Sequence, residues 1–220
     1  MEKEDIINKT KNFVYEKLFK ESSGHDWWHV KRVYENAVFI AGNEEGCDTF
    51  VIELAALLHD IADWKFHAGD LNKGAEVSAE FLSGLNVDAK TIAHVSDIVK
   101  NISFKGANTT NVISTVEGKI VHDADRLDAI GAIGIARTFA YGGFKNLEMY
   151  DPETKAVLHN SFEEYKNSKS TTINHFYEKL LLLKDLMNTE TAKKMALKRH
   201  SFMEKFLKEF FDEWNGTRLI

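Results

Sequence analysis

The 220-residue sequence is poor in residues that interrupt or cross-link a chain. It has one proline, 13 glycines and a single cysteine, Cys47. One cysteine excludes a disulfide within the chain and a zinc site built on several thiolates. This usage suits a reducing cytosol, so we expect a cytoplasmic protein. The scarcity of proline and glycine leaves little linker material and no low-complexity tract.

A basic stripe and a long apolar run are missing as well. The formal net charge is -6, and apolar runs such as Leu180 to Leu183 fall far short of a membrane span. An acidic chain without a basic stripe argues against a nucleic-acid polymer as the main partner. We therefore expect neither a polymer nor a membrane as partner, while a few local cations would suffice for a small phosphorylated ligand.

Apolar residues, by contrast, recur at spacings of three and four nearly everywhere, and period-two alternation is scarce. The pattern predicts an all-α fold with one domain over residues 1–220. We expect the core of this domain at about 24–141, with amphipathic helices at about 171–215 packing on it. The segment 51–58 shows apolar residues on every side, which predicts a central, fully surrounded helix.

Several helix ends can also be predicted. Asp26 is a candidate N-cap for the second helix, Asp48 or Thr49 for the third, and the last helix begins near Thr189. The segment 111–141 predicts one long or broken helix, because its glycines permit a bend or close packing.

Acids and histidines stand where a core helix would carry leucine. The stretch LAALLHDIAD ends with His59 and Asp60, and a buried aspartate without a partner costs several kcal/mol. In GHDWWHVKRV, His29 lies four residues before Val33, so it shares the inward face of a helix. The stretch VHDADRLDAIG places three carboxylates among apolar residues, where they repel one another and need positive charge nearby.

Imidazole and carboxylate ligands without a thiolate suit Mn²⁺, Fe²⁺, Co²⁺, Ni²⁺, Mg²⁺ or Zn²⁺. Two histidines and two aspartates leave coordination positions open for water and a substrate oxygen. The reaction class that follows is hydrolysis of a phosphorus ester or anhydride. We expect one divalent ion, with manganese favoured.

Three motifs then carry a family resemblance: HVKRV at 29–33, LLHDIAD at 57–63 and ADRL at 124–127. They resemble the signatures of the HD-domain metal-dependent phosphohydrolases, whose all-helical fold holds an H…HD…D metal site. The resemblance implies that His29, His59, Asp60 and Asp125 are the metal ligands. Over about residues 24–214 the chain also resembles small bacterial HD proteins linked to nucleoside-triphosphate pyrophosphohydrolysis, which implies a nucleotide as substrate.

Alternatives exist for the ligands. His25 competes with His29, which we prefer for its H-x-x-R-V context; His25 then lies at the rim, facing substrate. Asp123 competes with Asp125, which we prefer from the ADRL match. A second ion would use His94 and His122, which lie between the HD pair and the last aspartate.

Residues for chemistry and substrate binding follow with less specificity. Asp63, one helical turn from His59, and Asp128 are candidates to take a proton from water or to orient the ligands. The cations that would neutralise charge on a polyphosphate are Lys65, Lys100, Lys105 and Arg126. Alternative functions are a phosphomonoesterase, a cyclic-nucleotide phosphodiesterase, a non-catalytic nucleotide sensor and a helical scaffold; a homodimer is left open.

Overall fold

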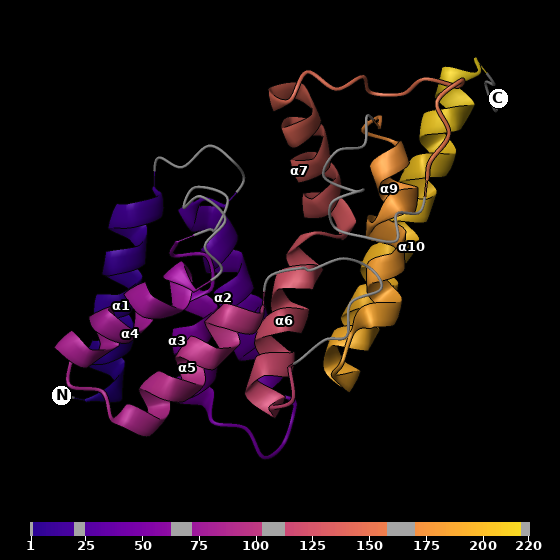
Figure 1. Cartoon of the computed structure of the whole chain (residues 1–220). Helices are drawn as coiled ribbons and strands as arrows, with labels where there is room; N and C mark the ends of the chain where they lie inside the picture. The colour runs from indigo at the N-terminus through magenta and orange to yellow at the C-terminus, as the bar shows by residue number, and fades with distance from the viewer. Residues whose placement is uncertain (1, 20–24, 63–71, 103–112, 158–169, 217–220) are drawn as a thin grey trace. The chain divides into compact units, whose positions relative to one another are not determined.

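The computed structural model describes residues 2–19, 25–62, 72–102, 113–157 and 170–216, and every regular element in these ranges is a helix (Figure 1). The predicted all-α class is confirmed. The described chain forms two compact units, one ending at Asp125 and one beginning at Arg126. Each is described by itself. The expected core, 24–141, is thus divided between them, while a single domain over 1–220 stays a prediction.

The first unit is built around α3. Its helices are α1 (Lys3–Leu18), α2 (Trp27–Ala41), α3 (Thr49–Leu58), α4 (Lys73–Gly84), α5 (Ala89–Asn101) and most of α6 (Val116–Asp128). α3 packs against α1, α2 and α5, and all its residues from Leu54 to Leu58 are buried. The prediction of a central, surrounded helix is therefore confirmed.

Carboxylate caps set where two of these helices begin. The side chain of Asp26 accepts a hydrogen bond from the backbone N–H of His29, and that of Asp48 accepts from Phe50 and Val51. These bonds satisfy N–H groups that have no partner inside the helix. Both predicted caps are confirmed, and the choice between Asp48 and Thr49 falls to Asp48.

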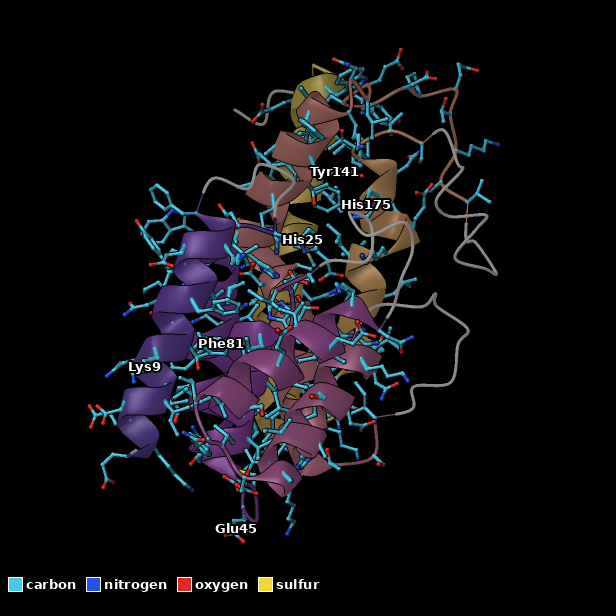
Figure 2. All side chains as sticks on the ribbon, turned by 60° about the vertical axis from the view of Figure 1, so that its left-hand side comes forward. Lys9, His25, Glu45, Phe81, Tyr141 and His175 are labelled. Atoms are coloured by element: carbon cyan, nitrogen blue, oxygen red, sulfur yellow. The ribbon has the colours of Figure 1, made fainter. Side chains whose placement is uncertain are left out.

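Aromatic packing closes the far side of this unit. Phe81 of α4, labelled in Figure 2, stacks on Phe13 of α1 with ring centroids 4.0 Å apart. Tyr34 of α2 donates a 2.6 Å hydrogen bond to Glu53, the one acidic residue of α3, and this bond links the two helices. These contacts fix α2 and α3, the two helices that carry most of the histidine motifs.

The second unit contains α7 (Gly131–Phe144), α9 (Asn174–Glu178), the 3₁₀ helix η2 (Leu180–Leu186) and α10 (Glu190–Trp214). Of the long or broken helix predicted over 111–141, the structure has the broken form, and the break lies next to Gly131, whose φ of +77° favours glycine. Gly134 lies against the carbonyl of Ala129, where a Cβ would come within 2.2 Å of the oxygen. The glycines therefore supply both the bend and the close packing.

The helix expected after residue 171 differs from the prediction. Between residue 171 and the start of α10, the α-helical part is α9, which has five residues. Lys179, with φ -143°, ends it, and the leucine run that follows forms the 3₁₀ helix η2. α10 begins as expected, with Thr189 accepting from the N–H of Ala192, and it packs against α7 and η2. Not one of the described helices combines the length and the apolar character that crossing a bilayer requires.

Candidate metal centre

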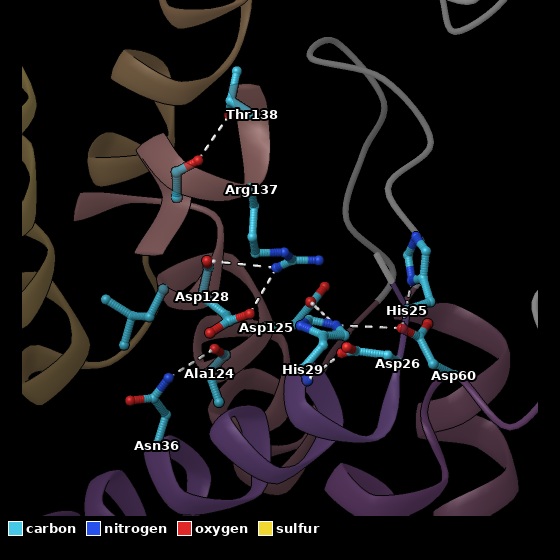
Figure 3. A network of polar contacts seen from close by, with 12 residues as sticks. His25, Asp26, His29, Asn36, Asp60, Ala124, Asp125, Asp128, Arg137 and Thr138 are labelled. Atoms are coloured by element: carbon cyan, nitrogen blue, oxygen red, sulfur yellow. Dashed lines mark hydrogen bonds and ion pairs between the residues drawn. The ribbon is translucent and has the colours of Figure 1, made fainter. Parts of the chain in front are cut away.

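Three segments of the first unit bring the predicted ligands together. His29 lies in the first turn of α2, His59 and Asp60 lie in the turn that ends α3, and Asp125 lies in α6. The Asp26 cap fixes the start of α2 and so the height of His29 on that helix (Figure 3). The side-chain amide of Asn36 donates to the carbonyl of Ala124 at 3.5 Å, which ties α2 to α6 one residue before Asp125.

The donor atoms converge closely. His29 Nε2 lies 3.3 Å from His59 Nε2, 3.3 Å from Asp60 Oδ2 and 3.4 Å from Asp125 Oδ1. His59 Nε2 also lies 3.3 Å from Asp60 Oδ2. The rings of both histidines are almost fully buried, while Asp125 keeps 36% of its side chain exposed. The cluster is thus buried on the histidine side and open at Asp125.

These separations suit one ion. Ligand atoms at about 2.1 Å from a metal are about 3.0 Å apart at right angles and about 3.4 Å apart at tetrahedral angles. The four separations between donor atoms given above, 3.3 to 3.4 Å, fall within this range. Nitrogen and carboxylate oxygen donors are also the set that a first-row divalent ion accepts. The residues therefore fit a divalent metal.

One histidine is oriented for ligation by the backbone. His59 Nδ1 lies 2.8 Å from the carbonyl of Ala56, an oxygen that can only accept. In the neutral ring the proton is therefore on Nδ1, and the lone pair of Nε2 faces the cluster. Metal-ligating histidines commonly donate their second ring N–H to a carbonyl or carboxylate in this way.

The histidines and aspartates of the cluster shift one another's pKa values. Burial alone would lower the pKa of His59, but the carboxylates of Asp60 and Asp125 outweigh it, and the net pKa is raised. Burial alone would raise the pKa of Asp60, but the histidines around it, His25 first, hold it well below its usual range. The pKa of Asp125 is likewise lowered, by His29 and His59 against the effect of burial. The carboxylates are therefore ionised at neutral pH.

His25 joins the cluster from its edge. Its Nδ1 lies 2.6 Å from Asp60 Oδ2, and its ring meets that of His29 edge-on with centroids 5.7 Å apart. Two sets of potential ligand atoms emerge, each within 4.8 Å: His25, His29 and Asp60, and His29, His59 and Asp125. His29 belongs to both, which agrees with our preference for it as a ligand.

The remaining acids of α6 lie elsewhere. Asp123 is fully buried and belongs to neither set among the described residues. Asp128, in the second unit, forms an ion pair with Arg137, whose Nη1 lies 2.6 Å from its Oδ2. Arg126 donates from Nη1 to the carbonyl of Leu186 at 2.5 Å, so part of its guanidinium serves the backbone of η2.

The remaining predicted residues lie outside both ligand sets or outside the described residues. Lys100 is exposed in the last turn of α5, whereas Asp63, Lys65 and Lys105 lie outside the described residues. His94 Nε2 lies 3.2 Å from Thr115 Oγ1 and 3.6 Å from a carboxylate oxygen of Glu117. His122 is buried in α6, and neither histidine belongs to a described ligand set.

Two contributions escaped the sequence analysis. Arg137 pairs with Asp128 across the break at Gly131, and helical periodicity gives no signal for a contact across a bend. The role of the Ala56 carbonyl is a backbone contact, which residue types do not show, although the i, i−3 relation to His59 is readable once α3 is known to end there.

Comparison with known proteins decides the family. The HD domain family model matches residues 27–130. YpgQ of Bacillus subtilis (strain 168) is 39% identical over 201 residues, which cover 90% of this chain and 89% of YpgQ. The chain belongs to the HD-domain superfamily. Within it, an HD-superfamily hydrolase of Bacillus thuringiensis is 44% identical with a TM-score of 0.76, covering 97% of this chain and 99% of that one.

Two further solved structures are similar to this chain. A protein of Lactobacillus plantarum is 36% identical with a TM-score of 0.84, covering 98% of this chain and all of that one. YpgQ itself, solved in complex with ADP, has a TM-score of 0.72 at 33% identity and covers 94% of this chain and 97% of its own. The structural likeness to these proteins therefore extends over nearly the whole chain, while the HD domain model itself matches residues 27–130.

Proposed function

We propose that the protein is a divalent-metal-dependent phosphohydrolase that converts (deoxy)nucleoside triphosphates to the monophosphate and pyrophosphate. The observation that carries the proposal is the cluster of His29, His59, Asp60 and Asp125, with the donor separations of one ion. Membership of the HD-domain superfamily, which includes hydrolases, supports the reaction class. The complex of YpgQ with ADP supports a nucleotide as ligand.

His29, His59, Asp60 and Asp125 would hold the ion. A divalent ion bound there supplies Lewis acidity toward a phosphoryl oxygen and toward water. The partial exposure of Asp125 supports an approach of substrate from that side of the cluster. The buried histidine rings keep bulk water away from the opposite side, where low polarity strengthens electrostatic interactions.

In the proposed reaction the oxygen of water forms a bond to the α-phosphorus, and the bond from this phosphorus to the bridging oxygen breaks. Pyrophosphate leaves with that oxygen, and a carboxylate takes the proton from water. Asp63 is our candidate for this carboxylate. The ion pair of Asp128 with Arg137 makes Asp128 the weaker candidate, because a guanidinium stabilises the ionised form.

Substrate charge would be met by the cations predicted from the sequence. Lys65, Lys100 and Lys105 keep this proposed role. Arg126 keeps it only through the part of its guanidinium that does not serve the Leu186 carbonyl. Manganese remains our preferred ion, because the mixed imidazole and carboxylate donor set suits it and leaves positions open for oxygen ligands.

A product assay tests the proposal. The purified protein is incubated with each (d)NTP and Mn²⁺, and pyrophosphate and orthophosphate are measured separately. We expect pyrophosphate and the nucleoside monophosphate in equal amounts. Orthophosphate as the sole phosphorus product would favour a phosphomonoesterase instead. The proposal that the protein is an enzyme would be contradicted if intact nucleotide is recovered after long incubation with each of Mn²⁺, Co²⁺, Ni²⁺, Zn²⁺, Fe²⁺ and Mg²⁺ in turn.

A further inference from the structure

His25 is not one of the four proposed ligands, yet its contact with Asp60 is shorter than the contacts among those ligands described above. Its Nδ1 lies 2.6 Å from Asp60 Oδ2, whereas His29 and His59 lie 3.3 Å from the same oxygen. The His25 side chain is 26% exposed and that of Asp60 is 16% exposed. A partly accessible ring thus contacts the Asp60 oxygen that also lies near His29 and His59; Figure 3 shows the contacts of His25 and His29 with Asp60.

The backbone holds His25 where this contact is made. His25 directly precedes Asp26, the N-cap, so it lies outside α2 and its ring need not follow the helix face. The ring meets that of His29 at 85°, with centroids 5.7 Å apart, an edge-on aromatic arrangement. One end of the imidazole is therefore supported by His29 while Nδ1 points at Asp60.

The contact distance identifies its nature. Two ligand atoms about 2.1 Å from one ion are at least about 3.0 Å apart at the usual coordination angles. At 2.6 Å, His25 Nδ1 and Asp60 Oδ2 are too close for two ligands of one ion, but they are at the distance of a charge-assisted hydrogen bond. The ring nitrogen therefore donates to the carboxylate.

Asp60 has a particular need for such a donor. It follows α3, in the turn where helical hydrogen bonding has ended, and its carboxylate group is free to rotate about its last side-chain bond. A carboxylate oxygen has two lone pairs, so it can accept a hydrogen bond and bind an ion at once. A donor on one lone pair fixes where the other points.

We propose that His25 is a positioning residue, which donates from Nδ1 to Asp60 Oδ2 and thereby aligns Asp60 for the metal. The inference rests on the proposed function insofar as it requires the metal centre. Hydrogen bonds to ligating carboxylates typically change metal affinity by about 10- to 100-fold. We expect an effect of this size from the loss of the His25 donor.

The test compares three variants by metal binding rather than by turnover. His25→Leu removes the donor. His25→Asn carries an amide nitrogen the same number of bonds from Cα as Nδ1, and His25→Gln carries the same amide one carbon further out. Mn²⁺ affinity is measured by titration calorimetry, and the visible spectrum of the Co²⁺ form is recorded at saturation. Circular dichroism checks that each variant is folded.

We expect Mn²⁺ to bind about 10- to 100-fold more weakly to the Leu variant. Asn should restore most of the affinity and Gln should not, and all Co²⁺ spectra should match the wild type because the ligand set is unchanged. The Asn and Gln pair decides the matter if the Leu variant does not fold. Wild-type affinity in the Leu and Gln variants, or an altered Co²⁺ spectrum, would overturn the positioning role.

The same experiment separates this inference from the proposed function. If the wild-type protein binds neither Mn²⁺ nor Co²⁺, the metal-dependent hydrolase fails and His25 has nothing to position. If the wild type binds Mn²⁺ and the variants bind it equally well, only the role of His25 fails.

Discussion

Two carboxylates of α6, three residues apart, have different partners: one contacts a histidine and the other an arginine. Asp125 is the last residue of the first unit, and its Oδ1 lies 3.4 Å from Nε2 of His29. Asp128, in the second unit, is almost fully buried and accepts a 2.6 Å hydrogen bond from Arg137. One helix thus carries an acid that shares a cluster with histidines and an acid that has a permanent cation.

The difference separates a binding site from a structural brace. A guanidinium does not lose its proton in a protein, so the charge of Asp128 is compensated under all conditions. Imidazoles compensate Asp60 and Asp125 only while they are protonated, and they can exchange that proton for a metal ion. The first unit therefore holds charge whose partner can change, and the second holds charge whose partner is fixed.

Removing a carboxylate from the histidine cluster should have the largest effect. Asp60→Ala deletes the oxygen shared by three imidazoles, so we expect Mn²⁺ binding and phosphohydrolase activity to be abolished. Helical content should persist, since Asp60 lies after the end of α3. Elemental analysis, the product assay and circular dichroism on one preparation check this. Glu45→Ala, which removes an exposed carboxylate from the loop after α2, is the control and should keep both metal and activity.

Breaking the brace should instead cost stability. Arg137→Met removes the ion pair that the buried Asp128 makes with Arg137, and we expect the free energy of unfolding to fall by about 2–3 kcal/mol. This is less than for a fully buried pair, because Arg137 is 28% exposed. Denaturant unfolding measures it. Combining Arg137→Met with Asp128→Asn should restore part of the loss, and Mn²⁺ affinity should match wild type in Arg137→Met. A loss of metal affinity equal to that of Asp60→Ala would erase the distinction between site and brace.

The pH dependence of the metal-free protein sharpens the comparison. The raised pKa of His59 contributes stability that is complete below the ordinary histidine pKa of 6.5 and is lost as the pH rises through the folded value. The metal-free protein, measured in the presence of a chelator, should therefore be less stable at pH 8 than at pH 6.5. The depressed pKa of Asp60 adds stability that is lost only in strong acid, so it does not contribute to this window.

Saturation with Mn²⁺ should remove or reverse this slope, because the ion replaces the proton on the histidines. His175 of the second unit provides an internal contrast. Burial and, less strongly, Lys179 lower its pKa to about 3, so it is neutral in the folded chain across this window, and the partial protonation of the unfolded chain near pH 6.5 gives it only a small slope of the opposite sign. Thermal unfolding at pH 6.5 and pH 8, with chelator and with Mn²⁺, provides the measurement. A chelated protein that gains stability toward pH 8 would contradict the charge balance inferred for the cluster.

The same contrast shows what the sequence could predict. The resemblance of the three motifs implied His29, His59, Asp60 and Asp125 as one ligand set, and the donor atoms of these residues lie close together in the structure. Whether they bind metal stays a prediction. The caps at Asp26, Asp48 and Thr189 were predictable because capping is a contact within a few residues.

Contacts that depend on chain reversal were not predictable. Arg137 reaches Asp128 only because Gly131 breaks the helix, and the sequence left open whether the glycines bend the chain or pack it closely. The five residues of α9 were expected to continue as α-helix, since the apolar spacing of the leucine run fits either helix type. Arg126 was assigned to substrate from its charge alone, and its bond to the Leu186 carbonyl has no sequence signal.

The smallest expected effect concerns the helix caps. Removing them distinguishes an effect on metal binding from an effect on helix stability. Asp26→Ala and Asp48→Ala each remove an N-cap carboxylate, and each should lower the free energy of unfolding by about 1 kcal/mol. Only Asp26 accepts from the backbone of a proposed ligand, His29, so only Asp26→Ala should also weaken Mn²⁺ binding. Asp48 caps α3 at the end opposite His59, and its loss should leave the affinity unchanged. Denaturant unfolding and Mn²⁺ titration on both variants measure the two effects separately. Equal weakening of metal binding in both would mean that the cluster responds to the stability of the whole unit rather than to the local placement of His29.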